Sequence, residues 1–292
     1  MLIRKKSLKI QERLGMRIGV AYGSSSIPII KTPSQAMSVL EEIYRAGFKA
    51  LLLPHDLFSQ IYSISDLYKE AYTDLLRIKT LASKYNIELA IHNPCLPNEP
   101  YLDEKFKIFL NISNVMDIRT FIIHPNFYSM VPKNQAIKLV IHKISEMVSE
   151  HGVRTTIGIE TTGHINELGS IEDVIEIVTR TRNTEPILNW AHIHARSAGY
   201  LRSEEEFKKV INQVKSKYTR PWLNNAYFLF SGITYGPSGE IKHISFKNSD
   251  LKLQNLIKTI FWFGIKGTLI FETPGREKDI VDMLEDLGDM VR

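Results

Sequence analysis

Cysteine is almost absent from this sequence of 292 residues, where Cys95 is the only one. A single cysteine excludes an internal disulfide and fits a reducing compartment. Long apolar runs are also lacking, since no stretch approaches the roughly 18 residues that a membrane span needs. The basic first segment, residues 1–15, has no apolar stretch of the kind found in secretory signals. We therefore expect a cytoplasmic protein that makes no use of a membrane.

Acidic residues are slightly outnumbered by basic ones, 32 against 37, which gives a net charge of +5. The excess is compatible with a polyanionic partner such as nucleic acid. The charges are dispersed, apart from residues 4–6 and 209–220. With 43% hydrophobic and 24% charged residues, the composition is that of an ordinary globular protein. Composition alone therefore permits nucleic-acid binding without indicating it strongly.

Eight short apolar runs divide the sequence, and each is followed by helical apolar spacing. The runs cover residues 17–22, 49–55, 87–92, 119–124, 154–160, 186–192, 226–232 and 267–272, and the expected helices cover 34–46, 65–84, 103–115, 134–150, 170–181, 203–217, 251–263 and 277–290. Eight such units predict an α/β fold, the (β/α)8 TIM barrel, in which continuous apolar strands are covered on both faces. Since a barrel takes about 250 residues, we expect one domain over residues 16–292. A basic leader over residues 1–15 precedes it, as a flexible arm or an upstream start.

Five of the runs end on a residue that can bind a metal: His92, His124, Glu160, His192 and Glu272. The C-terminal ends of barrel strands face one mouth, so these side chains are expected to converge there. Imidazole and carboxylate ligands suit Zn²⁺, with Mn²⁺ or Fe²⁺ as alternatives. Two histidines and one glutamate leave positions open for water and substrate, as in catalytic sites. Any one of them, taken alone, is equally a polar residue that ends a strand.

Other polar residues near the expected mouth are less informative. His194 follows His192 by two positions, and in a strand both would face the same way. His243 falls in the long loop after the seventh strand, where a histidine is usually solvated. Arg196 and Lys242 are either phosphate ligands or ordinary exposed charges. The remaining histidines are His55, which ends the second strand, and His142, His151 and His164, which we expect to be incidental.

Taken together, these motifs resemble a known family. In order along the chain, IHNP, FIIHPNFY, IETTGHINELGS, NWAHIHARSAG, FSGITYGPSGEIKHISF and FETP resemble the endonuclease IV family of abasic-site endonucleases. The likeness is to its archaeal branch, within the xylose-isomerase-like barrel superfamily, and spans about residues 16–290. It implies a barrel with three zinc ions at its mouth that cuts the DNA phosphodiester 5′ to an abasic site by water attack. The expected partner is double-stranded DNA with an abasic or damaged site, bound by a monomer.

Carried over by position, the resemblance assigns ligands to each ion. His92, His124 and Glu160 match the ligands of the first metal, with Glu160 bridging to the second. Glu272 matches a second-metal ligand, and His192 and His243 match ligands of the third. Glu160 and Glu272 would be the catalytic carboxylates, since they hold the ions and orient the attacking water.

Three positions depart from the family pattern. Asn189 stands where the family has an aspartate ligand to the second metal, Leu229 where it usually has a histidine, and Ile241 where the bacterial enzymes have an aspartate. The loop NPCLPNEPYL after the first histidine departs as well. The second metal would keep only Glu160 and Glu272, and the loss of an ion would remove transition-state stabilisation.

Three functions therefore remain open. The first is a metal-dependent DNA repair endonuclease, a hydrolase with an altered metal centre. The second is a sugar isomerase or epimerase on the same barrel, which uses one or two divalent ions and a carboxylate base. The third is a paralogue that binds damaged DNA without cutting it.

Overall fold

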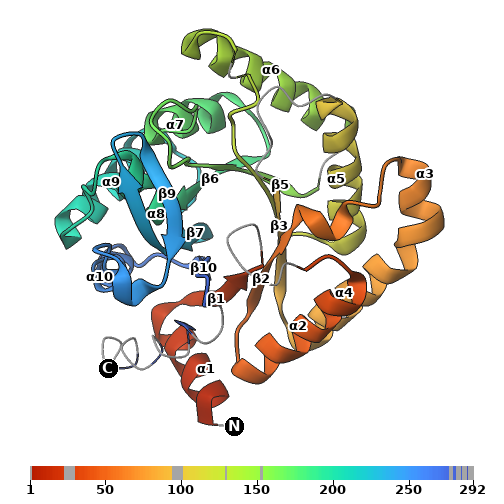
Figure 1. Ribbon diagram of the computed structural model, residues 1–292, viewed down its shortest axis with the longest axis horizontal. Helices are drawn as coiled ribbons and strands as arrows, with labels where there is room; N and C mark the ends of the chain where they lie inside the picture. Colours follow the sequence, from red (N-terminus) through yellow and green to blue (C-terminus); the bar gives the residue numbers. More distant parts are fainter. Residues whose placement is uncertain are drawn as a thin grey trace.

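The computed structural model describes residues 2–22, 30–93, 101–128, 130–151 and 154–275, with single residues at 279, 280, 284 and 288. Eight parallel strands close into a barrel in the order β1-β10-β7-β6-β5-β4-β3-β2 (Figure 1). The barrel strands are β1 Met16–Ala21, β2 Ala50–Pro54, β3 Glu88–Asn93, β4 Thr120–Ile123, β5 Thr156–Glu160, β6 Thr184–Asn189, β7 Ala226–Phe230 and β10 Gly267–Phe271. The predicted (β/α)8 barrel is confirmed.

Helices surround the barrel close to the ranges that the sequence predicts (Figure 1). They are α2 Pro33–Ala46, α4 Tyr72–Tyr85, α5 Leu102–Met116, α6 Lys133–His151, α7 Ile171–Arg180, α9 Glu204–Lys217 and α10 Leu253–Phe263. The helix expected over 65–84 is broken, because a short α3, Ile64–Asp66, and a π-helical turn, Leu67–Ala71, precede α4. Of the helix expected over 277–290, only residues 279, 280, 284 and 288 are described, and all four are helical. Most of the loop NPCLPNEPYL lies outside the described residues. Within the described ranges, no helix is both long and apolar enough to cross a membrane.

Apolar side chains fill both sides of the sheet. A small cluster occupies the barrel interior: Ala21, Ala50, Leu52, Ala90, Ile122, Ile187, Tyr227, Leu229 and Ile270. A much larger cluster packs between the strands and the helices. Each strand thus buries both faces, which explains why the eight runs are continuously apolar instead of alternating.

A polar network closes the N-terminal end of the barrel. Arg119, just before β4, donates from its two terminal nitrogens to the two carboxylate oxygens of Glu185, at 2.6 and 3.2 Å. Its guanidinium also lies over the ring of Tyr227, at 5.0 Å from the centroid. This end of a (β/α)8 barrel serves stability, so the chemistry is expected at the opposite mouth.

For residues 1–15, a flexible arm is one of the two expectations from the sequence. Residues 2–14 instead form helix α1, Leu2–Leu14. Ile10 and Leu14 are buried, and the side chain of Gln11 donates to the carbonyl of Gly47 at 2.8 Å. Gln11 also accepts from the backbone N–H of Ile18 at 2.8 Å. The basic leader is therefore packed against β1 and the end of α2 (Figure 1).

Two segments at the mouth differ from the expected pattern. The sixth strand ends at Asn189, and the residues after it form helix α8, Trp190–Arg196, so His192 lies on a helix and not at a strand end. Asn189 causes this break, because its side-chain Oδ1 accepts from the backbone N–H of Ala191 and His192 and caps the helix. The expected loop after strand seven is an antiparallel hairpin, β8 Gly232–Gly236 and β9 Gly239–Ile244, packed on α8 (Figure 1).

Candidate metal centre

Three side chains from neighbouring strands meet at the C-terminal end of the barrel. His92 lies in β3, His124 follows β4 directly, and Glu160 ends β5. The Nε2 atoms of His92 and His124 lie 3.0 and 3.4 Å from Glu160 Oε2. We call these three residues the first cluster. The sequence predicts their meeting because the third, fourth and fifth strands are neighbours in the closed sheet.

The first cluster leaves three polar atoms facing one another without hydrogen bonds. The Nε2 atoms of His92 and His124 and the Oε2 atom of Glu160 are buried, and no described residue meets any of them in hydrogen-bond geometry. Buried polar atoms are costly when unpaired. One divalent cation would satisfy all three, and two imidazoles with one carboxylate suit Zn²⁺, Mn²⁺ or Fe²⁺. The donor set of the first cluster therefore fits a catalytic metal.

Burial and the neighbouring charges shift the pKa values of Glu160 and His92 in opposite directions. Burial raises the pKa of Glu160, but the adjacent His124 and His92 outweigh it and hold that pKa well below its usual value. Burial lowers the pKa of His92, yet the carboxylate of Glu160 outweighs it and raises that pKa. Glu160 is thus a carboxylate that stays ionised although its side chain is fully buried. A bound cation would compete with the proton on His92 Nε2.

A second cluster lies beside the first, built from His192 on α8 with Glu240 and His243 on β9. His192 Nε2 lies 3.1 Å from Glu240 Oε2, and His243 Nε2 lies 3.2 Å from Glu240 Oε1. The two Nε2 atoms are 3.3 Å apart. The second cluster therefore repeats the two-imidazole, one-carboxylate donor set. His192 also joins the clusters, since its Nδ1 lies 3.2 Å from Glu160 Oε1.

Backbone carbonyls orient both rings of the second cluster. The Nδ1 of His192 lies 2.8 Å from the carbonyl oxygen of Thr161, and the Nδ1 of His243 lies 3.2 Å from that of Glu272. A carbonyl only accepts, so each Nδ1 carries a proton, and each Nε2 is left to face Glu240 or a bound cation. Metal-binding histidines are usually held in this way. The donor set and ring orientation of the second cluster therefore also fit a divalent cation.

Charge also ties the second cluster together. Burial lowers the pKa of His192, but the carboxylates of Glu240 and Glu160 outweigh it and raise that pKa to about 10. Burial raises the pKa of Glu240, while His192 and His243 outweigh it and lower that pKa to about 2. At neutral pH and without a cation, the second cluster is therefore an ion-paired group.

Glu240 was missed by the sequence reasoning, which placed Ile241 at the ligand position. In a regular strand, residues two apart share a face, so Ile241 would lie beside His243. The hairpin instead contains a bulge: Thr234 pairs with Lys242 while the next residue, Tyr235, pairs with Glu240. The extra residue shifts the alternation by one, as bulges beside functional sites often do. Ile241 is consequently 65% exposed, and the carboxylate comes from Glu240.

Two glycines let the hairpin reach the mouth. Gly239 has a φ of +97°, and a side chain there would collide with the backbone of Gly163. A side chain at Gly163 would in turn collide with the carboxylate of Glu240. The backbone N–H of Glu240 donates to the carbonyl of Gly163 at 3.0 Å, so the loop after β5 fixes the hairpin.

The space between Glu160 and Glu272 is taken by an amide instead of a metal-binding group. Asn189 Nδ2 lies 3.0 Å from Glu160 Oε1 and 2.9 Å from Glu272 Oε2. Leu229, fully buried, pairs with Asn189 across the β6–β7 register. Glu272 follows β10, and its buried side chain joins neither cluster. The residues present therefore do not fit a second metal of the kind that the resemblance implies.

Residues that the sequence left ambiguous have structural partners. His194 points away from the clusters: its Nε2 lies 3.1 Å from Asp250, and its Nδ1 accepts from the backbone N–H of Leu201. Asp250 also accepts from the hydroxyl of Tyr235 at 2.7 Å. Arg196, expected as a phosphate ligand or an exposed charge, donates to carbonyl oxygens of the loop after β5, including those of residues 164, 165 and 167. Its role is to hold that loop.

Four more expected residues belong to neither cluster. His55 starts a 3₁₀ turn, His55–Phe58, and its Nδ1 lies 3.9 Å from Asp56. His164 is exposed and forms an isolated bridge with Gly239. His142 lies within α6, as the sequence predicts, and Lys242 is exposed on the hairpin.

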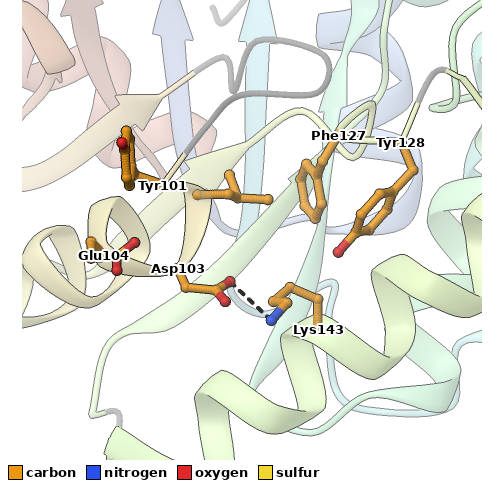
Figure 2. A pocket seen from close by; sticks show the side chains of 7 residues that line it. Tyr101, Asp103, Glu104, Phe127, Tyr128 and Lys143 are labelled. Atoms are coloured by element: carbon orange, nitrogen blue, oxygen red, sulfur yellow. Dashed lines mark ion pairs between the residues drawn. The ribbon is translucent and has the colours of Figure 1, made fainter.

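A cavity of about 380 Å³ lies between α5 and α6, beside the loop after β4 (Figure 2). Its walls include Tyr101, Phe127 and Tyr128, and its one lysine, Lys143, is paired with Asp103 at 2.9 Å. The figure shows Tyr128 and Lys143 facing the same space (Figure 2). It contains no residue of either cluster, and its cation is already neutralised, so it is not a phosphate site.

A family model described as xylose isomerase-like TIM barrel matches residues 40–289. The chain belongs to this family. An uncharacterised protein of Methanocaldococcus jannaschii is 26% identical over 170 residues, which is 57% of this chain and 62% of that protein. The chain thus matches less than two thirds of the length of this relative.

Solved structures share the fold at low sequence identity. SacUVDE superposes with a TM-score of 0.67 at 16% identity, over 94% of this chain and 99% of its own. A D-psicose 3-epimerase from Clostridium cellulolyticum superposes with a TM-score of 0.66 at 11% identity, over 95% of this chain and 98% of its own. A xylose isomerase domain protein from Alicyclobacillus acidocaldarius has a TM-score of 0.63 at 11% identity, over 94% of this chain and 99% of its own. These likenesses establish the barrel; its chemistry has to come from the site.

Proposed function

We propose that the chain is a metal-dependent phosphodiester hydrolase that cuts DNA at abasic or damaged sites. The observation that carries the proposal is the pair of adjacent clusters, each with two histidines and one carboxylate, linked through His192. Bound divalent ions would activate water and neutralise charge on the phosphoryl oxygens, as in two-metal hydrolases. Zn²⁺ is the ion best suited to this donor set, with Mn²⁺ and Fe²⁺ as alternatives.

Two carboxylates at the mouth take different roles in this proposal. Glu160 touches three histidines and stays ionised in full burial, so it holds the first cluster together. Glu272 belongs to neither cluster and is oriented by Asn189, so we assign it to accept a proton from the attacking water. The water oxygen bonds to phosphorus, the bond from phosphorus to the 3′ oxygen breaks, and that oxygen takes up a proton.

The hairpin gives the site a place for the DNA backbone. Lys242 and Lys247 are exposed on and just after β9, next to the second cluster. Contacts from such lysines to phosphates make binding weaken with salt. We expect Lys242→Ala to lower the slope of log affinity against log salt by about one.

The proposal is tested on a 5′-labelled duplex with one synthetic abasic site, incubated with Zn²⁺, Mn²⁺ or EDTA. The wild-type chain should give a product cut 5′ to the lesion, and EDTA should abolish it. Glu160→Gln should lose both metal and cleavage, whereas Glu272→Gln should keep the metal and lose cleavage. Glu176→Gln, on the exposed face of α7, is the matched control and should cut normally. Cleavage that survives EDTA, or no cleavage by metal-loaded wild type, contradicts the proposal.

A second candidate is a metal-dependent sugar isomerase or epimerase. It is favoured by Glu160 and Glu272, two buried carboxylates on either side of Asn189, because moving a proton next to a carbonyl needs carboxylate acid–base groups. Turnover of ketose–aldose pairs with Mn²⁺, in protein that leaves the abasic duplex uncut, would support it. Tight, salt-sensitive binding of damaged duplex with neither reaction would instead support a DNA-binding protein without activity.

A further inference from the structure

Both polar side-chain atoms of Asn189 have hydrogen-bond partners at the C-terminal end of the barrel. Its Oδ1 accepts from the backbone N–H of Ala191 at 3.1 Å and of His192 at 3.2 Å, which caps α8. This cap decides the orientation of the amide, because only the oxygen can accept from those two N–H groups. The Nδ2 must therefore face inward, where it lies 3.0 Å from Glu160 and 2.9 Å from Glu272.

An amide held in this way does what a cation would do between two carboxylates. Glu160 is fully buried and Glu272 is 6% exposed, so both need a donor or a positive charge beside them. The two protons on Nδ2 can serve both carboxylates without a metal, and His192 Nε2, at 3.3 Å, is the third polar atom beside this nitrogen. Leu229, which pairs with Asn189 in the sheet and is fully buried, offers no ligand atom on the neighbouring strand.

We infer that Asn189 is a built-in substitute for a metal ion, and that the chain holds two ions, one in each cluster, with none between Glu160 and Glu272. The choice between asparagine and aspartate at this position then sets the number of metals. An aspartate would keep the helix cap with one oxygen and turn the other toward two carboxylates. Three negative groups in a buried space would require a cation. The inference builds on the proposed metal-dependent function but not on the identity of its substrate.

Metal content and thermal stability test this inference without any activity assay. The wild-type chain, equilibrated with Zn²⁺ and desalted, should carry two ions per chain by elemental analysis. Metal-free Asn189→Asp should melt about 5–10 °C below metal-free wild type, because three buried carboxylates face one another. Zinc should restore Asn189→Asp to the wild-type melting temperature. The double variant Asn189→Asp, Leu229→His should carry three ions.

A matched variant controls for the general effect of replacing an amide by a carboxylate. Asn183 donates to the carbonyl of Thr155 at 2.8 Å, at the opposite end of β6. Asn183→Asp should lose stability equally with and without zinc, whereas the loss in Asn189→Asp should disappear with zinc. Three ions in the wild-type chain would overturn the inference, as would an Asn189→Asp variant whose metal-free stability matches wild type. Two ions with no DNA cleavage would refute the proposed function and leave this inference standing.

Discussion

Replacing Glu240 by glutamine tests whether the hairpin bulge delivers the carboxylate of the second cluster. Its pKa of about 2, against an ordinary 4.5, corresponds to about 3 kcal/mol of interaction in the metal-free protein. The shift of His192 is larger because Glu160 and Glu272 also act on that ring, whereas the shift of Glu240 sums the effects of His192, His243 and His164. A loss of about 3 kcal/mol lowers the melting temperature of a chain of this size by roughly 5 °C, because the unfolding entropy is about 2.1 cal/mol/K per residue.

The pH at which the Glu240→Gln effect is measured matters. The lowered pKa of Glu240 gives stability that is present above about pH 4.5 and lost as pH falls toward 2. The raised pKa of His192 gives stability that is complete below about pH 6.5 and lost as pH rises toward 10. The full effect is therefore expected between these limits, and urea unfolding of metal-free protein at about pH 5.5 should show it.

Ile241→Asp is the matched variant for this prediction. Its side chain points to solvent, so a carboxylate there should neither change stability nor rescue Glu240→Gln. The zinc content of Glu240→Gln should fall by one ion per chain while that of Ile241→Asp stays unchanged. A loss of less than about 1 kcal/mol in Glu240→Gln, or restored metal binding when Ile241→Asp is added to it, would refute the bulged register.

Three further outcomes follow from contacts around the barrel. Tyr235→Phe should lower the free energy of unfolding by about 1 kcal/mol, because Asp250 loses a hydrogen-bond donor that helps hold the hairpin to His194. Zinc titration should show weaker binding at the second cluster and unchanged binding at the first. Equal weakening at both clusters would contradict this prediction. Arg119→Ala should destabilise the chain by about 3 kcal/mol, because buried Glu185 loses its guanidinium partner and keeps the hydrogen bond from the Thr120 hydroxyl. Urea unfolding measures that loss, and any change in zinc content would show that the network reaches the mouth. Finally, EDTA should lower the melting temperature of wild type, since ligand at about 100 times its Kd adds about 2.7 kcal/mol, and an unchanged melting temperature would argue against a native metal.

Much of the barrel could be predicted from the sequence because its strands are buried on both faces. Continuous apolar runs mark such strands, and parallel pairing in chain order then follows. His92, His124, Glu160 and Glu272 could be predicted to converge because the C-terminal ends of parallel barrel strands face one mouth. The structure brings these four residues to the same end of the barrel. Of the four, only His92, His124 and Glu160 place their ligand atoms close enough to share one metal ion.

The rest of the site depends on local geometry that apolar periodicity does not report. Asn189 ends β6 early by capping α8, which puts His192 on a helix and turns His194 away. The bulge in the hairpin exchanges Ile241 for Glu240. The sequence signal for this exchange is the closeness of Glu240 and His243 in the chain, directly after Gly239 at a hairpin turn.

Anomalous diffraction from crystals grown with zinc tests the central claim most directly. We predict two peaks: one about 2.0–2.2 Å from the Nε2 atoms of His92 and His124 and from Glu160, the other equally close to His192, Glu240 and His243. No peak is expected between Glu160 and Glu272, where Asn189 lies. A mouth without any peak after growth in zinc would contradict a metal-dependent site, and a third peak beside Asn189 would contradict the two-metal centre.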